Sequence, residues 1–254
     1  MKKLGDTRTM NFFDCNCSYG VPSHPAFRFA RTPAELLEEM DWCGMDRGLV
    51  YVAGLRYGSP VLWNELTAQD LASQPRLEPT WGILPSQTGE QAPPEQFVTQ
   101  MKASGVRALW AFPNEHHYRL NDVTFGDLLE LLTQKYIPLF AKLNAIALGE
   151  LMKDFPDLTA VAVNQGPHSL ERYLRPLFDT YPNLYLDTSY LLVEGLIEEF
   201  CERYGPRRLL FGSAFPDNCS GSALLRLTQA EIDDEAKRTI AGDNLERLLG
   251  EVRI

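Results

Sequence analysis

Residues 208–216 read RLLFGSAFP, a short apolar run followed by small residues and a proline. A continuous apolar run of this length is typical of a strand that is buried on both faces of a parallel sheet. Runs of the same kind recur along the chain, separated by segments with helical periodicity. We expect strands at Asn11–Cys17, Gly48–Ala53, Pro79–Leu84, Val106–Phe112, Ile137–Lys142, Ala160–Asn164, Leu184–Thr188 and Arg208–Gly212.

The segments between these runs predict helices. Residues 32–35 read TPAE, a capping box with proline at the first helical position. We expect helices over Leu36–Cys43, Phe125–Gln134, Leu170–Tyr181 and Val193–Tyr204, a second capping box at 228–231 and a capped final helix over Asp243–Gly250.

The alternation of about eight strands with helices in 254 residues is typical of one parallel α/β barrel. No repeat and no low-complexity linker divides the chain. We therefore predict an α/β fold, a single (β/α)8 TIM barrel over residues 1–254. An open doubly wound sheet is the alternative.

The formal net charge of −10 disfavours nucleic acid and anionic membranes as partners, because both need a basic face. The chain shows no apolar signal segment and no stretch long enough to span a bilayer. We expect a cytoplasmic protein with a small-molecule ligand, and the sequence is also compatible with a homo-oligomer. An odd number of cysteines, without the spacing of a disulfide framework, favours a reducing compartment such as the cytoplasm. These cysteines are Cys15, Cys17, Cys43, Cys201 and Cys219.

In a barrel of this kind the active site lies at the carboxyl ends of the strands. The first strand ends in FDCNCSYG (13–20), the fifth in IPLFAK (137–142), the sixth in AVAVNQG (160–166) and the eighth in FGSAFP (211–216). These segments, together with GDNLERLL at 242–249, resemble the amidohydrolase-related (amidohydrolase-2) branch of the amidohydrolase superfamily in framework and order. The resemblance covers nearly the whole chain.

The resemblance implies metal ligands at positions where this chain has other residues. In the family, two histidines of the first strand, one histidine each from the fifth and sixth strands, and an aspartate of the eighth strand bind metal. Asp14 and Gly20 match the family pattern around the first pair. The five ligand positions themselves hold Asn16, Ser18, Lys142, Asn164 and Ala214.

These replacements have a direct chemical consequence. Amide, hydroxyl and methyl groups do not hold a transition metal tightly, and Lys142 would place a positive charge where a cation would sit. Without the metal there is no Lewis acid and no activated water. We therefore predict no cofactor and no metal-dependent hydrolysis.

Lys142 and its surroundings give the first candidate site. The structural alternative to a functional Lys142 is an ion pair with Asp14 or Asp187, because a buried lysine must be paired or neutral. Asp14 itself is expected to be a hydrogen-bonded structural carboxylate. Cys15 and Cys17 alternate with it and are expected to pack as small apolar residues.

Other candidates follow the strand ends. We assign tentative catalytic roles to Lys142, His116 and His117, the histidines as proton carriers. We assign substrate binding to Asn16, Ser18, Asn164, Arg56 and Tyr190. Ser213 lacks an evident histidine partner and is not favoured as a nucleophile. Further residues expected at the mouth are Tyr57, Ser86, Ser189 and Asp217, with His24 and His168 facing solvent.

Three functional readings remain open from the sequence. The first is a metal-independent hydrolase or lyase, in which Lys142, Asn16 and Asn164 hold a small anionic substrate at the barrel mouth. The second is a catalytically inactive relative that binds a small ligand or a partner there. The third is a metal-dependent hydrolase with atypical ligands. The sequence does not decide whether the protein is an enzyme.

Overall fold

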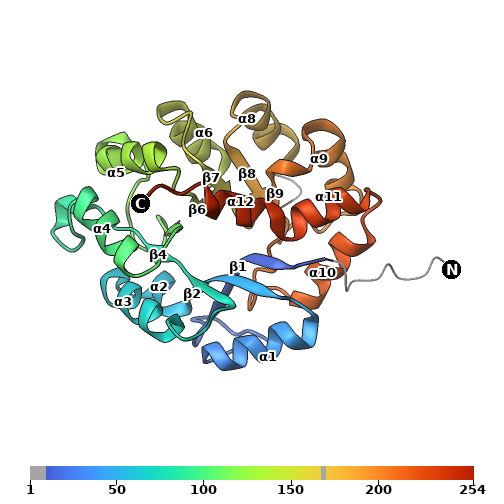
Figure 1. Ribbon diagram of the computed structural model, residues 1–254. Coiled ribbons are helices and arrows are strands. Elements are labelled where there is room, and N and C mark those ends of the chain that lie inside the picture. Colours follow the sequence, from blue (N-terminus) through green and yellow to red (C-terminus); the bar gives the residue numbers. More distant parts are fainter. Residues whose placement is uncertain (1–9, 167–169) are drawn as a thin grey trace.

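The computed structural model describes residues 10–166 and 170–254. Parallel strands lie at the centre and helices surround them, as the TIM-barrel prediction requires (Figure 1). The strands are shorter than predicted at most ends, because ladder pairing stops where the chain turns into the following loop. Their bounds are β1 Phe13–Tyr19, β2 Arg47–Val52, β3 Leu77–Pro79, β4 Trp81–Gly82, β5 Leu109–Ala111, β6 Leu139–Ala141, β7 Ala160–Ala162, β8 Leu184–Asp187 and β9 Leu209–Leu210.

The ladder between strands is interrupted at two points. Three strands pair in the order β1-β2-β3 and six in the order β4-β5-β6-β7-β8-β9. Thr80 separates β3 from β4, so these two short strands together are the third strand predicted from the sequence. Between β9 and β1 there is an isolated bridge from Cys17 to Phe215, and the Cys15 amide donates to the Phe211 carbonyl over 2.8 Å. These contacts bring the first and last strands together.

Helices cover the outside of the strands. No helix in the described ranges is long and apolar enough to cross a membrane. The α-helices are α1 Pro33–Cys43, α2 Ala53–Tyr57, α3 Pro60–Leu71, α4 Pro94–Ala103, α5 Asp122–Lys135, α6 Ala145–Asp154, α8 Arg175–Thr180, α9 Leu196–Tyr204, α10 Ser220–Gln229, α11 Asp234–Arg238 and α12 Asn244–Gly250. Short 3-10 turns cover Ser86–Thr88 and Pro206–Arg208, and π-helical turns cover Leu170–Leu174 and Thr239–Asp243.

The predicted helix caps are confirmed at α1 and wrong near the C-terminus. The Thr32 hydroxyl accepts from the Glu35 amide over 3.2 Å, as the capping box requires. Thr228 instead lies inside α10, and the next helix is capped by Asp233. Asp243 is no cap either, because the π-helical turn before α12 continues into that helix and gives Asp243 helical backbone angles.

The interior of the barrel contains both aromatic and polar side chains. Tyr51 of β2 contacts Trp110 of β5 with ring centroids 4.9 Å apart, and Trp110 stacks on Phe140 of β6 at 5.5 Å. Because the third strand separates β2 from β5, these rings meet across the inside of the barrel. Asp14 and Asn16 of β1, the strand that pairs with β2, are buried polar residues. Cys15 and Cys17 are buried and free, as predicted.

Candidate active site and family

Four polar residues form a closed network at the carboxyl ends of β1, β7 and β8; we call Asn16, Asn164, Asp187 and Ser189 the amide floor. The Asn16 side-chain amide donates one hydrogen bond to Asn164 Oδ1 over 2.7 Å and another to Asp187 Oδ2, also over 2.7 Å. The Ser189 hydroxyl donates its one proton to Asp187 Oδ2 over 2.5 Å, and its oxygen lies 3.1 Å from Asn164 Oδ1. Both donor hydrogens of the Asn16 amide are therefore used inside the protein.

The backbone around Asn164 positions its side chain for this role. Asn164 has φ 55°, in the left-handed region that asparagine tolerates better than most residues. Its backbone amide donates to Asp187 Oδ1 over 3.0 Å. Both carboxylate oxygens of Asp187 thus accept hydrogen bonds, which is how a buried carboxylate is stabilised.

A second buried carboxylate joins β1 to the turn after β9. Asp14 Oδ1 accepts from two backbone amides, that of Ser213 over 2.9 Å and that of Asn16 over 3.0 Å. The Ser213 hydroxyl donates to Asp14 Oδ2. This confirms the prediction of a structural, hydrogen-bonded Asp14. The Ser213 hydroxyl is committed to this carboxylate and is not free to act as a nucleophile.

Burial raises the pKa of both carboxyl groups. For Asp187 the loss of hydration raises the pKa to about 6, although the hydrogen bonds from Ser189, Asn16 and the Asn164 amide favour the charged form. Burial also raises the pKa of Asp14, against the hydrogen bonds from Ser213 and Asn16. In both carboxyl groups burial therefore favours the protonated form more than solvent does.

The donor set of the amide floor does not fit a transition metal. Zinc and its neighbours require imidazole, thiolate or carboxylate ligands, and the floor offers one carboxylate beside amide and hydroxyl groups. The Asn16 –NH₂ group lies between Asn164 Oδ1 and Asp187 Oδ2 and takes the place that a cation would need between these oxygens. In the described ranges, no group of three or more histidine, cysteine, aspartate or glutamate residues is placed to hold an ion.

The rim on the side of β2 is held by ion pairs. Arg56 Nε donates to Glu115 Oε1 over 2.9 Å, and an Arg56 guanidinium nitrogen lies 3.2 Å from Asp217 Oδ2. Asp217 Oδ1 is also 2.9 Å from His24 Nε2. Arg56 is neutralised by two carboxylates and ties the loops after β2, β5 and β9 together. It is at the mouth, as predicted, but its charge is already used by the protein.

A cleft of about 680 Å³ opens on the other side of the mouth, among the loops after β5, β6 and β7; we call it the mouth cleft. Among the residues that the structure describes, its lining contains Lys142, Arg119 and one acidic residue, Glu150. Asn164 also lines the cleft and so connects it to the amide floor. The α6 helix begins at the cleft and has no acidic residue in its first turn. Other amide side chains in the lining are Asn114, Asn121, Asn144 and Gln165.

The structural alternative for Lys142, a buried ion pair with Asp14 or Asp187, is wrong. Strand β6 ends at Ala141, so the chain has already left the barrel wall at Lys142 and the side chain is exposed at the rim. Asp14 and Asp187 accept hydrogen bonds from hydroxyl, amide and backbone groups instead. Lys142 therefore faces the mouth cleft rather than the amide floor.

The two candidate histidines lie apart from Lys142. His116 packs against Phe112 and Tyr118, and neither it nor His117 is among the described residues that line the mouth cleft. Burial lowers the pKa of His116, against opposing effects of Glu115 and of the Leu55 and Arg56 backbone. His117 is exposed, with φ 55°.

The remaining predicted positions are spread over the mouth. Ser18 is buried, and its hydroxyl donates to the Phe215 carbonyl over 3.4 Å. Ala214 is buried with φ 53°, and only a methyl group occupies the position where the family resemblance implies an aspartate. Tyr190 is half-buried, and burial together with the charge of Asp217 raises its pKa. His168 lies outside the described residues.

Two residues of the candidate site were missed or underrated in the sequence-based predictions. Asp187 was considered only as a partner for Lys142, although it is the last residue of β8 and so stands at a carboxyl strand end. Arg119 lies in the loop after β5, with no pattern around it that points to the mouth cleft.

Comparisons with known proteins agree with this arrangement. An uncharacterized TIM-barrel protein from Bordetella bronchiseptica superposes with TM-score 0.70 at 19% identity, covering 95% of this chain and 99% of that one. The 5-carboxyvanillate decarboxylase LigW from Sphingomonas paucimobilis gives TM-score 0.74 at 16% identity, with 95% and 99% coverage. A 2,6-dihydroxybenzoate decarboxylase from Rhizobium gives 0.74 at 12% identity, with the same coverage.

These identities are low enough that the likeness shows the fold alone. No curated protein matches the chain. The family model of the Amidohydro_2 amidohydrolases, however, matches residues 33–250, which include most of the barrel. The chain therefore belongs to the amidohydrolase-2 family.

Proposed function

We propose that this protein binds a small organic anion in the mouth cleft and does not use the metal-dependent hydrolysis of its family. The observation that carries the proposal is the grouping of Lys142, Arg119 and Asn164 around one cleft of about 680 Å³. Cavities of this size are typical of small-molecule sites.

Charge and hydrogen bonding both favour an anion there. The two cations outnumber Glu150 in the lining, and amide side chains supply donors for carboxylate oxygens. The helix dipole of α6 adds positive potential at its N-terminus, where no acidic residue of its first turn cancels it. The solved relatives include decarboxylases of 5-carboxyvanillate and 2,6-dihydroxybenzoate, which supports an aromatic carboxylate as the class to test.

The closed amide floor favours binding over turnover. Its hydrogen bonds are satisfied internally, and the described cleft residues include neither His116 nor His117 as a proton carrier. One observation supports metal-independent catalysis, by a hydrolase or lyase mechanism, as a second candidate. The pKa of Asp187 is about 6, and Asn164 connects this carboxyl group to the cleft.

Calorimetric titration with 2,6-dihydroxybenzoate tests the proposal, with 2,6-dihydroxybenzamide as the neutral probe of similar shape. We expect the acid to bind and Lys142→Met to weaken it at least tenfold, because a hydrogen bond to a charged group is worth about 1.5–3 kcal/mol. Arg119→Met should act in the same direction. Lys153→Met, at an exposed lysine near the far end of α6, is the control and should leave affinity unchanged.

Equal affinity for the acid and the amide, or affinity unchanged in both cleft variants, would refute the proposed anion site. The second candidate is tested by a screen of esters, lactones and aryl carboxylates. Turnover that persists in the presence of a metal chelator and is abolished in Asp187→Asn would favour metal-independent catalysis. Absence of turnover across the screen would leave binding as the function.

A further inference from the structure

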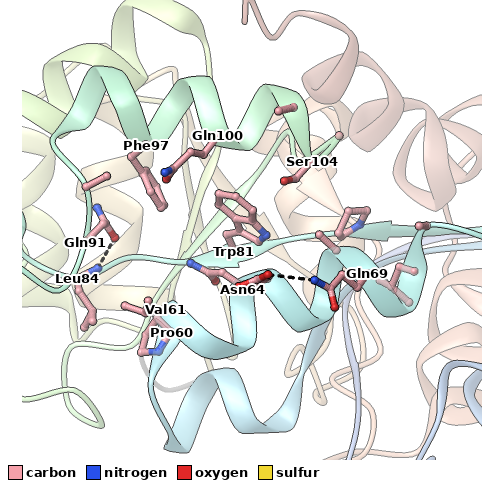
Figure 2. Close-up of a pocket in the computed structure, with 18 of the residues that line it drawn as sticks. Pro60, Val61, Asn64, Gln69, Trp81, Leu84, Gln91, Phe97, Gln100 and Ser104 are labelled. Carbon is pink, nitrogen blue, oxygen red and sulfur yellow. Dashed lines mark hydrogen bonds between the residues drawn. The ribbon is translucent and has the colours of Figure 1, made fainter.

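A groove of about 960 Å³ runs between α3 and α4 on the outside of the barrel, away from the residues of the mouth. Figure 2 shows Trp81 between the two helices, with Asn64 and Gln69 on α3 and with Phe97 and Gln100 on α4. We call this cavity the helix groove.

Trp81 carries an unused hydrogen-bond donor in the helix groove. The side chain is 6% exposed, and its Nε1 atom has no hydrogen-bond partner among the described residues. Buried donors in native proteins are nearly always paired, so an unpaired one needs an explanation. An acceptor supplied by a bound molecule would satisfy it.

The groove also offers an apolar surface of defined shape. The rings of Trp81 and Phe97 lie 5.6 Å apart with planes at 44°, and Pro60 and Leu84 extend the apolar lining. Flat apolar groups pack well against such ring pairs. The opening is bordered by the exposed amides Gln69 and Gln100.

The charges of the groove are all acidic. Glu65 and Glu90 are the charged residues in its described lining, with no lysine, arginine or histidine. This is the reverse of the mouth cleft, where cations prevail. A ligand with a positive charge is favoured by these carboxylates, and an aromatic face attracts cations as well.

We propose that the helix groove is a second binding site, for an organic cation with an aromatic body and a carbonyl oxygen. The carbonyl accepts from Trp81 Nε1, the aromatic body packs on Trp81 and Phe97, and the cationic end lies toward Glu65 or Glu90. Because Nε1 is itself covered, a lining side chain must move for the ligand to reach it. Gln100 and Gln69 are exposed lining residues, and the Gln69 amide, which donates to Glu65 over 3.1 Å, would release that carboxylate on moving. The volume of the groove lies within the usual range for drug-sized ligands.

The test compares two probes of similar size in ligand-observed NMR. Procainamide has an aromatic ring, an amide carbonyl and a tertiary ammonium group, and hippurate has a ring, an amide carbonyl and a carboxylate. We expect saturable binding of procainamide to the full-length protein, at least tenfold weaker in Gln100→Lys, which adds a positive charge at the rim. Trp81→Phe keeps the ring but removes the donor and should weaken binding about three- to tenfold.

The controls separate this site from the rest of the molecule. Trp42→Phe changes an exposed tryptophan of α1 that is not in the groove lining, and should leave binding unchanged. Lys142→Met should weaken hippurate at the mouth cleft without changing procainamide. Thermal denaturation of each variant establishes that it is folded.

Absence of saturable procainamide binding, or equal binding by wild type and Gln100→Lys, would overturn the proposal. A concentration-dependent dimer that Gln100→Lys dissociates would overturn it as well, because a second copy of the chain would then cover the groove. Neither result would affect the proposed anion site, because no described residue lines both the mouth cleft and the helix groove.

Discussion

Replacing Asn16 by aspartate removes the donor at the centre of the amide floor and adds a negative charge beside Asp187. In the native protein the Asn16 amide donates over 2.7 Å to Asn164 Oδ1 and over 2.7 Å to Asp187 Oδ2. An ionised aspartate accepts only, so both hydrogen bonds are lost. Two buried carboxylates then face each other at hydrogen-bond distance.

The size of the effect follows from these contacts. The hydrogen bond to charged Asp187 is worth about 1.5–3 kcal/mol, and the one to neutral Asn164 about 0.5–1.5 kcal/mol. The Coulomb repulsion at this separation is roughly 6 kcal/mol at an effective dielectric constant of about 20. The pair avoids most of it by binding one proton, because the pKa of Asp187 is already about 6 and protonation at pH 8 costs about 2.7 kcal/mol.

We therefore expect Asn16→Asp to lower the free energy of unfolding by about 3–5 kcal/mol at pH 8, the loss usual for a broken buried charge network. Differential scanning calorimetry should show Tm lower by about 6–20 °C. The loss should shrink at pH 5, where the shared proton restores one hydrogen bond, and on addition of Mg²⁺, which favours carboxylate and amide oxygens.

Asn144→Asp is the matched control for this prediction. Asn144 caps α6, with its Oδ1 atom accepting from the Ala147 amide over 3.0 Å, and aspartate serves equally well as an N-cap. The reasoning is refuted if Asn16→Asp is as stable as the wild type at pH 8. It is also refuted if both asparagine replacements have the same effect.

Two further predictions concern the same floor. The raised pKa of Asp187 means that the native state binds its proton more tightly than the unfolded state does. The free energy of unfolding should therefore fall by up to ~3 kcal/mol as pH rises from about 4 to about 6, and level off above. Asp187→Asn should flatten this slope in urea titrations, and an unchanged slope would contradict the prediction. Gly212→Ala should cost about 1–3 kcal/mol, since its Cβ would lie 2.9 Å from Asp187 Oδ2 and 3.3 Å from Asn16 Cβ. Gly149→Ala in α6, where the new Cβ meets only Leu177 at 3.6 Å, should be neutral or stabilising, and equal losses in the two variants would show that the floor is not tightly packed.

The fold could be predicted because strand burial and helix capping leave local patterns in the sequence. The run at 208–216 and the other apolar runs mark the barrel strands, and Thr32 begins α1 as its capping box predicts. The predicted caps at Thr228 and Asp243 are wrong because α10 already contains Thr228 and a π-helical turn runs through Asp243. Local patterns do not contain that information.

The sequence placed some residues of the candidate site correctly in space and others not. Asn16 and Asn164 come together across the barrel because both stand near carboxyl strand ends, a constraint that topology alone supplies. The path of the chain after β6 decides where Lys142 lies, and an exposed rim position cannot be distinguished from a buried one by strand spacing. Arg119 reaches the same cleft from another loop, which only the three-dimensional arrangement shows.

In the amide floor an asparagine amide, rather than a metal ion, lies between the oxygens of Asn164 and Asp187. The most direct test is an amide-selective NMR spectrum of the ¹⁵N-labelled protein during titration with Mn²⁺, with the Asn16 side-chain signals assigned by their loss in Asn16→Ser. We predict that both side-chain protons of Asn16 exchange slowly with water, because both are hydrogen-bonded in a buried site, and that they keep their intensity up to one equivalent of Mn²⁺. Selective disappearance of these signals and those of Asn164 at substoichiometric Mn²⁺ would place a metal in the floor and contradict the account.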